Sequence, residues 1–271
     1  MITIITVNRN NADGLKKTIE SVVHQSHTAF EYIVIDGDSA DGSRQVIDQY
    51  RDRLTIAVSE PDSGIYNAMN KAIKLAKGNY LLFLNSGDYL VNEHVLKAVA
   101  PRLTGYDVIS GDIILEENGK TYERASKDQV SLDFFFRMSL YHQATFISKK
   151  LFDQYGLYNE TFKIGGDYEF FIRVFYKHNA TYLHINEPVA YFKADGISNN
   201  SKFFDLKQQE SQMAWKLNVS ERVYQALTEH QQFENSPTYW LYHKAHTSKF
   251  YKGFFTWINQ VRNRMYRLFR K

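Results

Sequence analysis

The chain has 271 residues, of which 44% are hydrophobic and 15% aromatic, and it carries 33 basic against 30 acidic side chains. This length suits one large α/β domain with an appendage, and the apolar content excludes a disordered chain. The sequence contains no cysteine, which excludes a disulfide framework, a thiolate metal site and a cysteine nucleophile.

The first hundred residues alternate short β-branched runs with amphipathic helical patterns. Strands are predicted over 2–7, 32–35, 54–58 and 80–84, and helices over 14–25, 43–50 and 64–76, the last with Ile65, Met69, Ala72, Ile73 and Ala76 facing inward. Strand–helix alternation at this spacing predicts an α/β fold, with a Rossmann-like, doubly wound, mostly parallel sheet and helices on both faces.

Beyond residue 105 the alternation becomes irregular. Strands are predicted over 108–115, 121–124, 144–148, 181–185 and 189–193, with helical or turn patterns over 131–140, 149–155 and 167–178. From residue 203 onward the pattern is helical, with segments over 203–217, 220–232, 238–246 and 253–269. The end of the chain is therefore predicted to be a helical extension.

Acidic side chains follow three of the predicted parallel strands. Asp36, Asp38 and Asp41 come after the second strand, Asp62 after the third and Asp88 after the fourth. The carboxyl ends of such strands form the ligand-binding edge of a doubly wound sheet. Acids in loops also serve as turn formers and helix caps, which is the role expected of Asp41 and the open alternative for the others.

Four motifs occur in order along the chain. They are Thr6-Val7-Asn8-Arg9-Asn10 with Asp36-Gly37-Asp38-Ser39-Ala40-Asp41-Gly42, then Asp62-Ser63-Gly64-Ile65-Tyr66-Asn67-Ala68-Met69-Asn70-Lys71, then Asn85-Ser86-Gly87-Asp88, and finally Gly165-Gly166-Asp167. Together they resemble inverting family-2 glycosyltransferases, in particular enzymes that build bacterial O-antigen and capsule polysaccharides. The resemblance covers residues 1–195 and implies a GT-A fold and a metal-dependent, hexosyltransferase-type enzyme.

Three of these motifs depart from the pattern common in that family. The first loop has Asp36-Gly37-Asp38 where relatives commonly have Asp-Asp-Gly, so the middle acid has moved by one position. The loop after the fourth strand offers one carboxylate, Asp88, where relatives commonly offer two or three. Gly166 replaces the acid that precedes the base in relatives, so Asp167 stands alone, with Glu169 close in sequence.

The resemblance implies a role for individual residues. Asp36 is expected to accept the N–H of a uracil base, Asp88 to bind a divalent cation (Mn²⁺ or Mg²⁺), and Asp167 to act as general base. Contacts to the nucleotide sugar are expected from Thr6, Asn8, Asn10, Asp36, Asp38, Asp62, Lys71, Ser86 and Gly87, and contacts to the acceptor or diphosphate from His142 and Glu169. A solvated side chain is the open alternative for Lys71, and a structural histidine for His142.

Basic residues are concentrated at the end of the chain. The last acidic residue is Glu234, and eight basic residues follow it, so the part up to Glu234 has a net charge of −5. Within 253–269, apolar and aromatic residues recur every three or four positions opposite several arginines. A basic amphipathic helix of this kind is typical of interfacial membrane anchors, and packing on the catalytic domain or in a dimer interface is the alternative.

We therefore expect a GT-A catalytic domain over 1–200, with a nucleotide-binding half (1–104) and an acceptor-side half (105–200), and a helical, basic extension over 201–271. No signal-peptide pattern and no apolar run near the roughly 20 residues of a membrane span is present, so a cytoplasmic protein, peripheral at the inner face of the membrane, is expected. Its partners would be a nucleotide-sugar donor and a glycan or lipid-linked glycan, with no nucleic acid. The alternative is a catalytically silent sugar-nucleotide or glycan-binding subunit of a membrane-associated complex.

Overall fold

The computed structural model describes residues 1–117, 119–193 and 201–247, together with Gly253, Thr256 and Trp257. The chain divides into two compact units, Met1–Asn218 and Val219–Lys271. The second unit contains helices α9 (Glu221–Glu234) and α10 (Pro237–Thr247). Apart from those three residues, the helix predicted over 253–269 lies outside the described residues.

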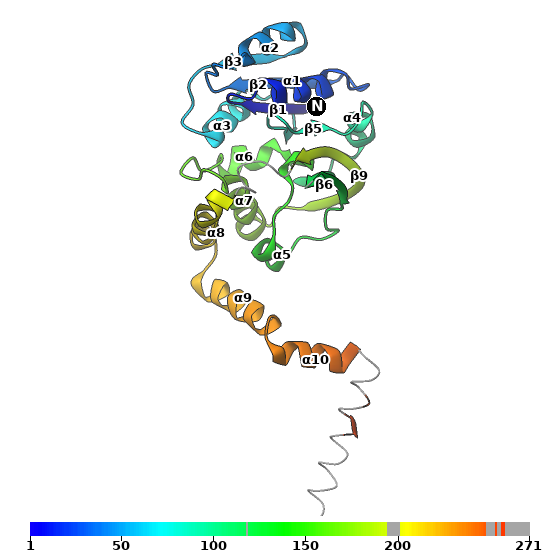
Figure 1. The fold of residues 1–271 in the computed structure, drawn as a ribbon, viewed down its shortest axis with the longest axis vertical. Helices are drawn as coiled ribbons and strands as arrows, with labels where there is room; N and C mark the ends of the chain where they lie inside the picture. Colours follow the sequence, from blue (N-terminus) through cyan, green and yellow to red (C-terminus); the bar gives the residue numbers. More distant parts are fainter. Residues whose placement is uncertain (118, 194–200, 248–252, 254–255, 258–271) are drawn as a thin grey trace, which may run out of the picture. The chain divides into compact units, whose positions relative to one another are not determined.

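The first half of Met1–Asn218 alternates strands and helices as predicted (Figure 1). Its elements are β1 (Ile2–Asn8), α1 (Ala12–Val23), β2 (Phe30–Asp36), α2 (Ser43–Gln49), the 3₁₀ turn η1 (Arg51–Arg53), β3 (Ile56–Ser59), α3 (Ile65–Leu75) and β4 (Tyr80–Phe83). The strands pair in parallel in the order β3-β2-β1-β4. Helices α1 and α2 lie on one face of this sheet and α3 on the other.

The second half contributes antiparallel strands to the same sheet. Its elements are β5 (Tyr89–Leu90), α4 (Val95–Val99), η2 (Ala100–Arg102), β6 (Val108–Glu117), β7 (Lys120–Arg124), α5 (Leu132–Arg137), η3 (His142–Ala144), β8 (Thr145–Ser148), α6 (Lys149–Tyr155), α7 (Gly166–Ile172), η4 (Arg173–Lys177), β9 (Tyr182–Lys193), η6 (Ser201–Phe203) and α8 (Phe204–Asn218). Within the described residues the strand order is β3-β2-β1-β4-β8-β6-β9-β5, with β7 on β6. The sheet is therefore parallel at one end and mixed at the other, where β9 alone runs parallel to β6.

Three local predictions differ from the structure. The two strands expected over 181–185 and 189–193 are one strand, β9, because the ladder with β6 continues past Pro188 through a shift in register opposite Asp112. Helix α7 ends at Ile172 and passes into a π-helical turn over Arg173–Lys177. Ile65 was expected to face inward but is 37% exposed, because it is the first residue of α3.

The central strands are buried on both faces, so apolar residues dominate their sequences, and polar residues within them, such as Thr3, Thr6 and Glu31, are hydrogen-bonded. Ile4, Ile5, Val34, Leu82 and Phe83 are completely buried. Burying one such side chain stabilises the fold by about 1.5–3 kcal/mol, so this packed core fixes the position of the carboxyl ends of the strands. None of the helices in the described part of the chain is long and apolar enough to span a bilayer.

Candidate functional site

Asp36, at the end of β2, is completely buried, and donors surround its carboxylate. It accepts hydrogen bonds from Asn8 Nδ2 (2.7 Å), Ser39 N (3.0 Å), Ser39 Oγ (2.6 Å) and Ser59 Oγ (2.7 Å). Burial raises the pKa of Asp36, and these hydrogen bonds together lower it below its usual value. Asp36 therefore organises the loop in this structure, and its predicted contact with a uracil base stays a prediction.

Other residues of the first motif also serve the loop or the interior. The Thr6 hydroxyl is buried 3.0 Å from Tyr32 OH, and the predicted contact of Thr6 with the nucleotide stays a prediction. Asn10 donates its backbone N–H to Ser39 Oγ (2.8 Å) and its Oδ1 accepts from Ala40 N (2.9 Å). These contacts fix the path of the chain at the edge of the sheet.

Asp41 is the turn residue that the sequence predicts. Its carboxylate accepts from Ser43 N (3.1 Å) and Ser43 Oγ (2.6 Å) at the start of α2 and from Ala12 N (2.8 Å) at the start of α1. Because one side chain satisfies donors at two helix starts, Asp41 joins α1 to α2 and plays a structural role.

Asp62 lies directly against Gly37. A Cβ at position 37 would stand 2.2 Å from Asp62 Oδ2, so a side chain there and the Asp62 carboxylate exclude each other. Asp38, with φ of 59°, turns away and pairs with Arg44 at the surface. Asp38, which lies one position later than the middle acid of the family pattern, therefore points away from the edge of the loop. Asp62, 3.6 Å from Arg9, supplies a carboxylate beside position 37 instead.

The Lys71 ammonium group is held by the segment before α3. Its Nζ donates to Pro61 O (2.9 Å) and pairs with Glu60 (2.7 Å). The structure thus places Lys71 against the loop that carries Asp62, which differs from the predicted position at a diphosphate.

The Asn85–Asp88 loop after β4 is fixed by side chains of α1 and its N-terminus. Thr18 Oγ1 accepts from Gly87 N (3.0 Å) and donates to Asp88 O (2.7 Å), and Asn11 Nδ2 donates to Ser86 O (2.9 Å). The roles of Thr18 and Asn11 could not be predicted from local sequence, because their partners lie about 70 residues away along the chain. These hydrogen bonds fix the backbone of the loop that carries the Asp88 side chain.

The oxygen atoms near Asp88 are few for a metal site. In the described residues no group of three or more His, Asp or Glu side chains is placed to hold a metal ion. The Asn85 Oδ1 atom is buried without a hydrogen-bond partner there, which adds a second oxygen in the same loop. Mg²⁺ and similar ions accept one or two protein oxygens when water and substrate phosphates complete the shell. The donor set therefore fits an ion shared with a diphosphate.

Asp167, in the first turn of α7, lies beside His142. The Asp167 Oδ2 atom is 3.2 Å from His142 Nδ1, and His142 Nε2 is 3.2 Å from Asn85 Nδ2; the Asp167 and His142 side chains are each 19% exposed. Burial lowers the pKa of His142, but Asp167 and Asp88 raise it above its usual value. Burial raises the pKa of Asp167, but His142 and Tyr66 bring it below its usual value. Contacts thus run from Asp167 through His142 to the Asp88 loop.

Tyr66, which sequence analysis missed, approaches Asp167 from α3. Its hydroxyl lies 3.0 Å from Asp167 Oδ1 and donates to Ile164 O (2.6 Å). A Cβ at position 166 would stand 2.8 Å from the Tyr66 ring, so glycine replaces the expected acid because the ring occupies its space. The neighbouring motif residue Asn70 donates to Tyr158 O (2.9 Å), so α3 holds the segment before Asp167 at two points.

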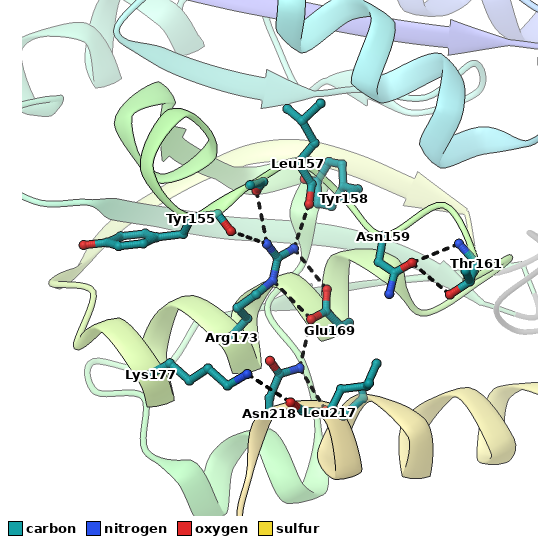
Figure 2. Close-up of polar contacts among 12 residues, drawn as sticks. Tyr155, Leu157, Tyr158, Asn159, Thr161, Glu169, Arg173, Lys177, Leu217 and Asn218 are labelled. Carbon is teal, nitrogen blue, oxygen red and sulfur yellow. Dashed lines mark hydrogen bonds and ion pairs between the residues drawn. The ribbon is translucent and has the colours of Figure 1, made fainter.

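Glu169 does not belong to the site. It is buried, pairs with Arg173 (3.1 Å), and accepts from Asn218 Nδ2 (2.9 Å), as Figure 2 shows. Arg173 also donates to the carbonyl oxygens of Tyr155 (2.6 Å) and Leu157 (2.8 Å). This network fixes α7 to the preceding loop and gives Glu169 a structural role; the predicted contact of Glu169 with acceptor or diphosphate stays a prediction.

Comparison with known sequences gives a match over most of the chain. Residues 2–177 match the model of the family described as "Glycosyl transferase family 2". A PGL/p-HBAD biosynthesis glycosyltransferase of Mycobacterium tuberculosis is 30% identical over 207 residues, which are 73% of this chain and 79% of the relative. The putative teichuronic acid biosynthesis glycosyltransferase TuaG of Bacillus subtilis is 31% identical over 147 residues, 48% of this chain and 58% of the relative.

Solved structures share the fold. Residues 1–349 of TarS from S. aureus, in complex with UDP-GlcNAc, align with a TM-score of 0.66 at 21% identity, over 88% of this chain and 74% of that one. The mannosyltransferase PcManGT from Pyrobaculum calidifontis, in complex with GDP-Man and Mn²⁺, aligns with a TM-score of 0.62 at 12% identity, over 96% and 79%. The predicted GT-A-type α/β fold is confirmed.

Proposed function

This chain belongs to glycosyl transferase family 2, and we propose that it transfers one sugar from a UDP-sugar to a hydroxyl group of a glycan, with inversion at the anomeric carbon. The observation that carries the proposal is the meeting of Asp167, from the second half, with the Asp88 loop of the first half through His142 and Asn85. Relatives whose names refer to PGL/p-HBAD and teichuronic acid biosynthesis support a role in making surface glycans.

We assign the proton transfer to Asp167, and its surroundings support this role. A lowered pKa keeps its carboxylate ionised at neutral pH, and Tyr66 and His142 fix its orientation. The acceptor oxygen attacks the anomeric carbon and passes its proton to Asp167, while the bond from that carbon to the diphosphate oxygen breaks. Asp88 and the Asn85 oxygen would hold a divalent cation together with the diphosphate, and the bound cation would supply positive charge to stabilise the departing nucleotide.

We propose that Asp62 recognises the nucleobase through a hydrogen bond. Its carboxylate stands where a side chain at position 37 would begin, at the carboxyl edge of β2 and β3. Position 37 carries the second acid in the pattern common in the family, and 5% of the Asp62 side chain is exposed there. A carboxylate accepts the N3–H of uracil, whereas cytosine presents an acceptor at the same atom. Asn8, Asn10 and Asp36 would then shape the loop around the base without touching it.

The test is calorimetric titration of the full chain with UDP, GDP, CDP and dTDP, each with and without Mn²⁺. We expect UDP to bind more tightly than GDP and CDP, and Mn²⁺ to strengthen its binding. Asp62→Asn should narrow the preference for UDP over CDP by about tenfold, a difference of about 1.4 kcal/mol. Asp48→Asn, which removes an exposed carboxylate from α2, is the matched control.

Two results would contradict the nucleotide assignment. A preference for GDP would fit the donor of the Pyrobaculum neighbour and remove Asp62 as a uracil reader. Binding of none of the four nucleotides would overturn the proposed transfer and favour a silent glycan-binding subunit.

We also propose that the acceptor is lipid-linked and that the basic end of the chain brings the protein to the inner membrane surface. The support is the sequence: eight basic residues follow Glu234 with no acid among them, and aromatic residues are interleaved with them. Each Lys or Arg near an anionic surface contributes about 1 kcal/mol of binding.

Deleting residues 250–271 is therefore expected to release the protein from liposomes containing anionic phospholipid. Sedimentation with the vesicles at low and high salt measures this, and neutral phosphatidylcholine vesicles are the control. Undiminished sedimentation of the truncated protein would refute the membrane role of this segment.

A further inference from the structure

Helix α8 lies outside the part of the chain that matches the family model, yet it contacts the segment that carries Asp167. The match ends at residue 177, and α8 spans Phe204–Asn218. Sequence analysis assigned these residues to the C-terminal extension, whereas the structure includes α8 in the compact unit Met1–Asn218. The buried residues of α8 are Glu210, Ala214, Trp215 and Asn218.

Glu210 binds the backbone just before Asp167. Its carboxylate accepts hydrogen bonds from the N–H groups of Lys163 (2.7 Å), Ile164 (2.9 Å) and Gly165 (2.8 Å). The Glu210 side chain is buried, and three successive donors converge on it. Hydrogen bonds to an ionised acceptor are about twice as strong as neutral ones, so this carboxylate fixes the loop 163–165 firmly.

Two further side chains of α8 bind the residues just after Asp167. Trp215 Nε1 donates to Tyr168 OH (2.8 Å), and Asn218 Nδ2 donates to Glu169 Oε1 (2.9 Å; Figure 2). Side chains of α8 thus bind the backbone before Asp167 and the side chains of the two residues after it. The Asp167 carboxylate itself is contacted by Tyr66 and His142.

A base acts only when its oxygen lies within hydrogen-bond reach of the acceptor hydroxyl. Displacement by about 1 Å costs on the order of 100-fold in rate. We propose, on the basis of the function proposed above, that Glu210 is a positioning residue for Asp167: by binding the three amides of 163–165, it sets the start of α7 and hence the place of the base. The catalytic unit then requires α8, which the family match does not include.

The carboxylate is essential to this role because all three partners are donors. Glutamine at position 210 retains one acceptor oxygen but turns an NH₂ group toward N–H groups, so at least one of the three amides loses its acceptor. Alanine removes all three hydrogen bonds. Glu210→Gln should therefore have a smaller effect than Glu210→Ala. Because Glu210→Gln preserves the volume of the buried side chain, it also serves as the test if the alanine variant does not fold.

The experiment compares full-length Glu210→Gln and Glu210→Ala with Asp205→Asn, which removes an exposed carboxylate from the same helix. Hydrogen exchange measures the amides of 163–165. Steady-state assays of UDP release from UDP-GlcNAc, UDP-glucose and UDP-galactose give kcat and KM. We expect faster exchange at 163–165 in both Glu210 variants and a kcat lower by about 10- to 100-fold, with an unchanged donor KM. Asp205→Asn should match the wild type in both assays.

Several results would overturn the proposal. Unchanged exchange at 163–165 would mean that Glu210 does not hold the loop, and faster exchange with an unaltered kcat would mean that the loop does not position the base. A parallel loss of kcat, donor affinity and thermal stability in Glu210→Gln would show a general structural role. No UDP release by the wild-type chain would overturn the proposed function and this role with it, a failure distinct from those of the variants.

Discussion

Asp167→Asn is expected to lower kcat for sugar transfer by about 10³-fold, which is the typical contribution of a general base. The amide cannot take the proton of the acceptor hydroxyl, but it keeps the size of the side chain and can still bond to Tyr66 and His142. UDP affinity should therefore stay within about twofold of the wild type, a free-energy change of less than about 0.5 kcal/mol. Rapid-quench assays of UDP release and calorimetry with UDP measure the two quantities.

The matched control is Asp153→Asn, which removes an exposed carboxylate from α6 in the same half of the unit. It should leave both quantities unchanged. Retained transfer by Asp167→Asn would exclude Asp167 as the base. A large loss of UDP affinity would move Asp167 to the donor side of the reaction.

The second large effect is expected from Asp88→Ala. Asp88 is the carboxylate of the Asn85–Asp88 loop, so its removal leaves the cation with the Asn85 oxygen, water and the diphosphate. We expect the strengthening of UDP binding by Mn²⁺ to fall by about tenfold or more, which corresponds to about 1.4 kcal/mol. Binding of UDP without metal should change little.

Calorimetric titration of UDP into Asp88→Ala, with and without Mn²⁺, measures this. Asp52→Asn, which changes an exposed acid in the same half, is the control. If the Mn²⁺ dependence of the Asp88 variant equals that of the wild type, Asp88 is not a ligand of the ion.

The parallel half of the fold could be predicted closely from the sequence. Strands β1, β2 and β4 are buried on both faces, so apolar residues occur on both faces of each strand and do not alternate with exposed polar residues. The mixed half was harder, because β9 continues through Pro188, where proline normally indicates an interruption. Strand direction in this half depends on long-range pairing, which hydrophobic periodicity does not report.

The candidate site could be predicted in part. The sequence motifs indicated Asp88, Asp167 and His142, and the structure brings His142 to Asp167 and to the Asp88 loop. The structural role of Asp36 could not be predicted, because a sequence does not reveal that a carboxylate accepts several hydrogen bonds within its own loop.

Residues that act across the fold were missed for a different reason. Tyr66 is 101 residues from Asp167, and Glu210 is 45 residues from Gly165. In its local sequence each is an ordinary helical residue, and only the packing of α3 and α8 against α7 gives it a role.

Inverting transfer from a UDP-sugar is tested most directly by proton NMR of the released sugar. The wild-type chain is given α-linked UDP-GlcNAc, UDP-glucose or UDP-galactose, with water as acceptor. The β-anomer is expected to accumulate first and then to equilibrate by mutarotation. First appearance of the α-anomer would contradict inversion, and no release from any of the three donors, with or without Mn²⁺, would contradict UDP-sugar transfer itself.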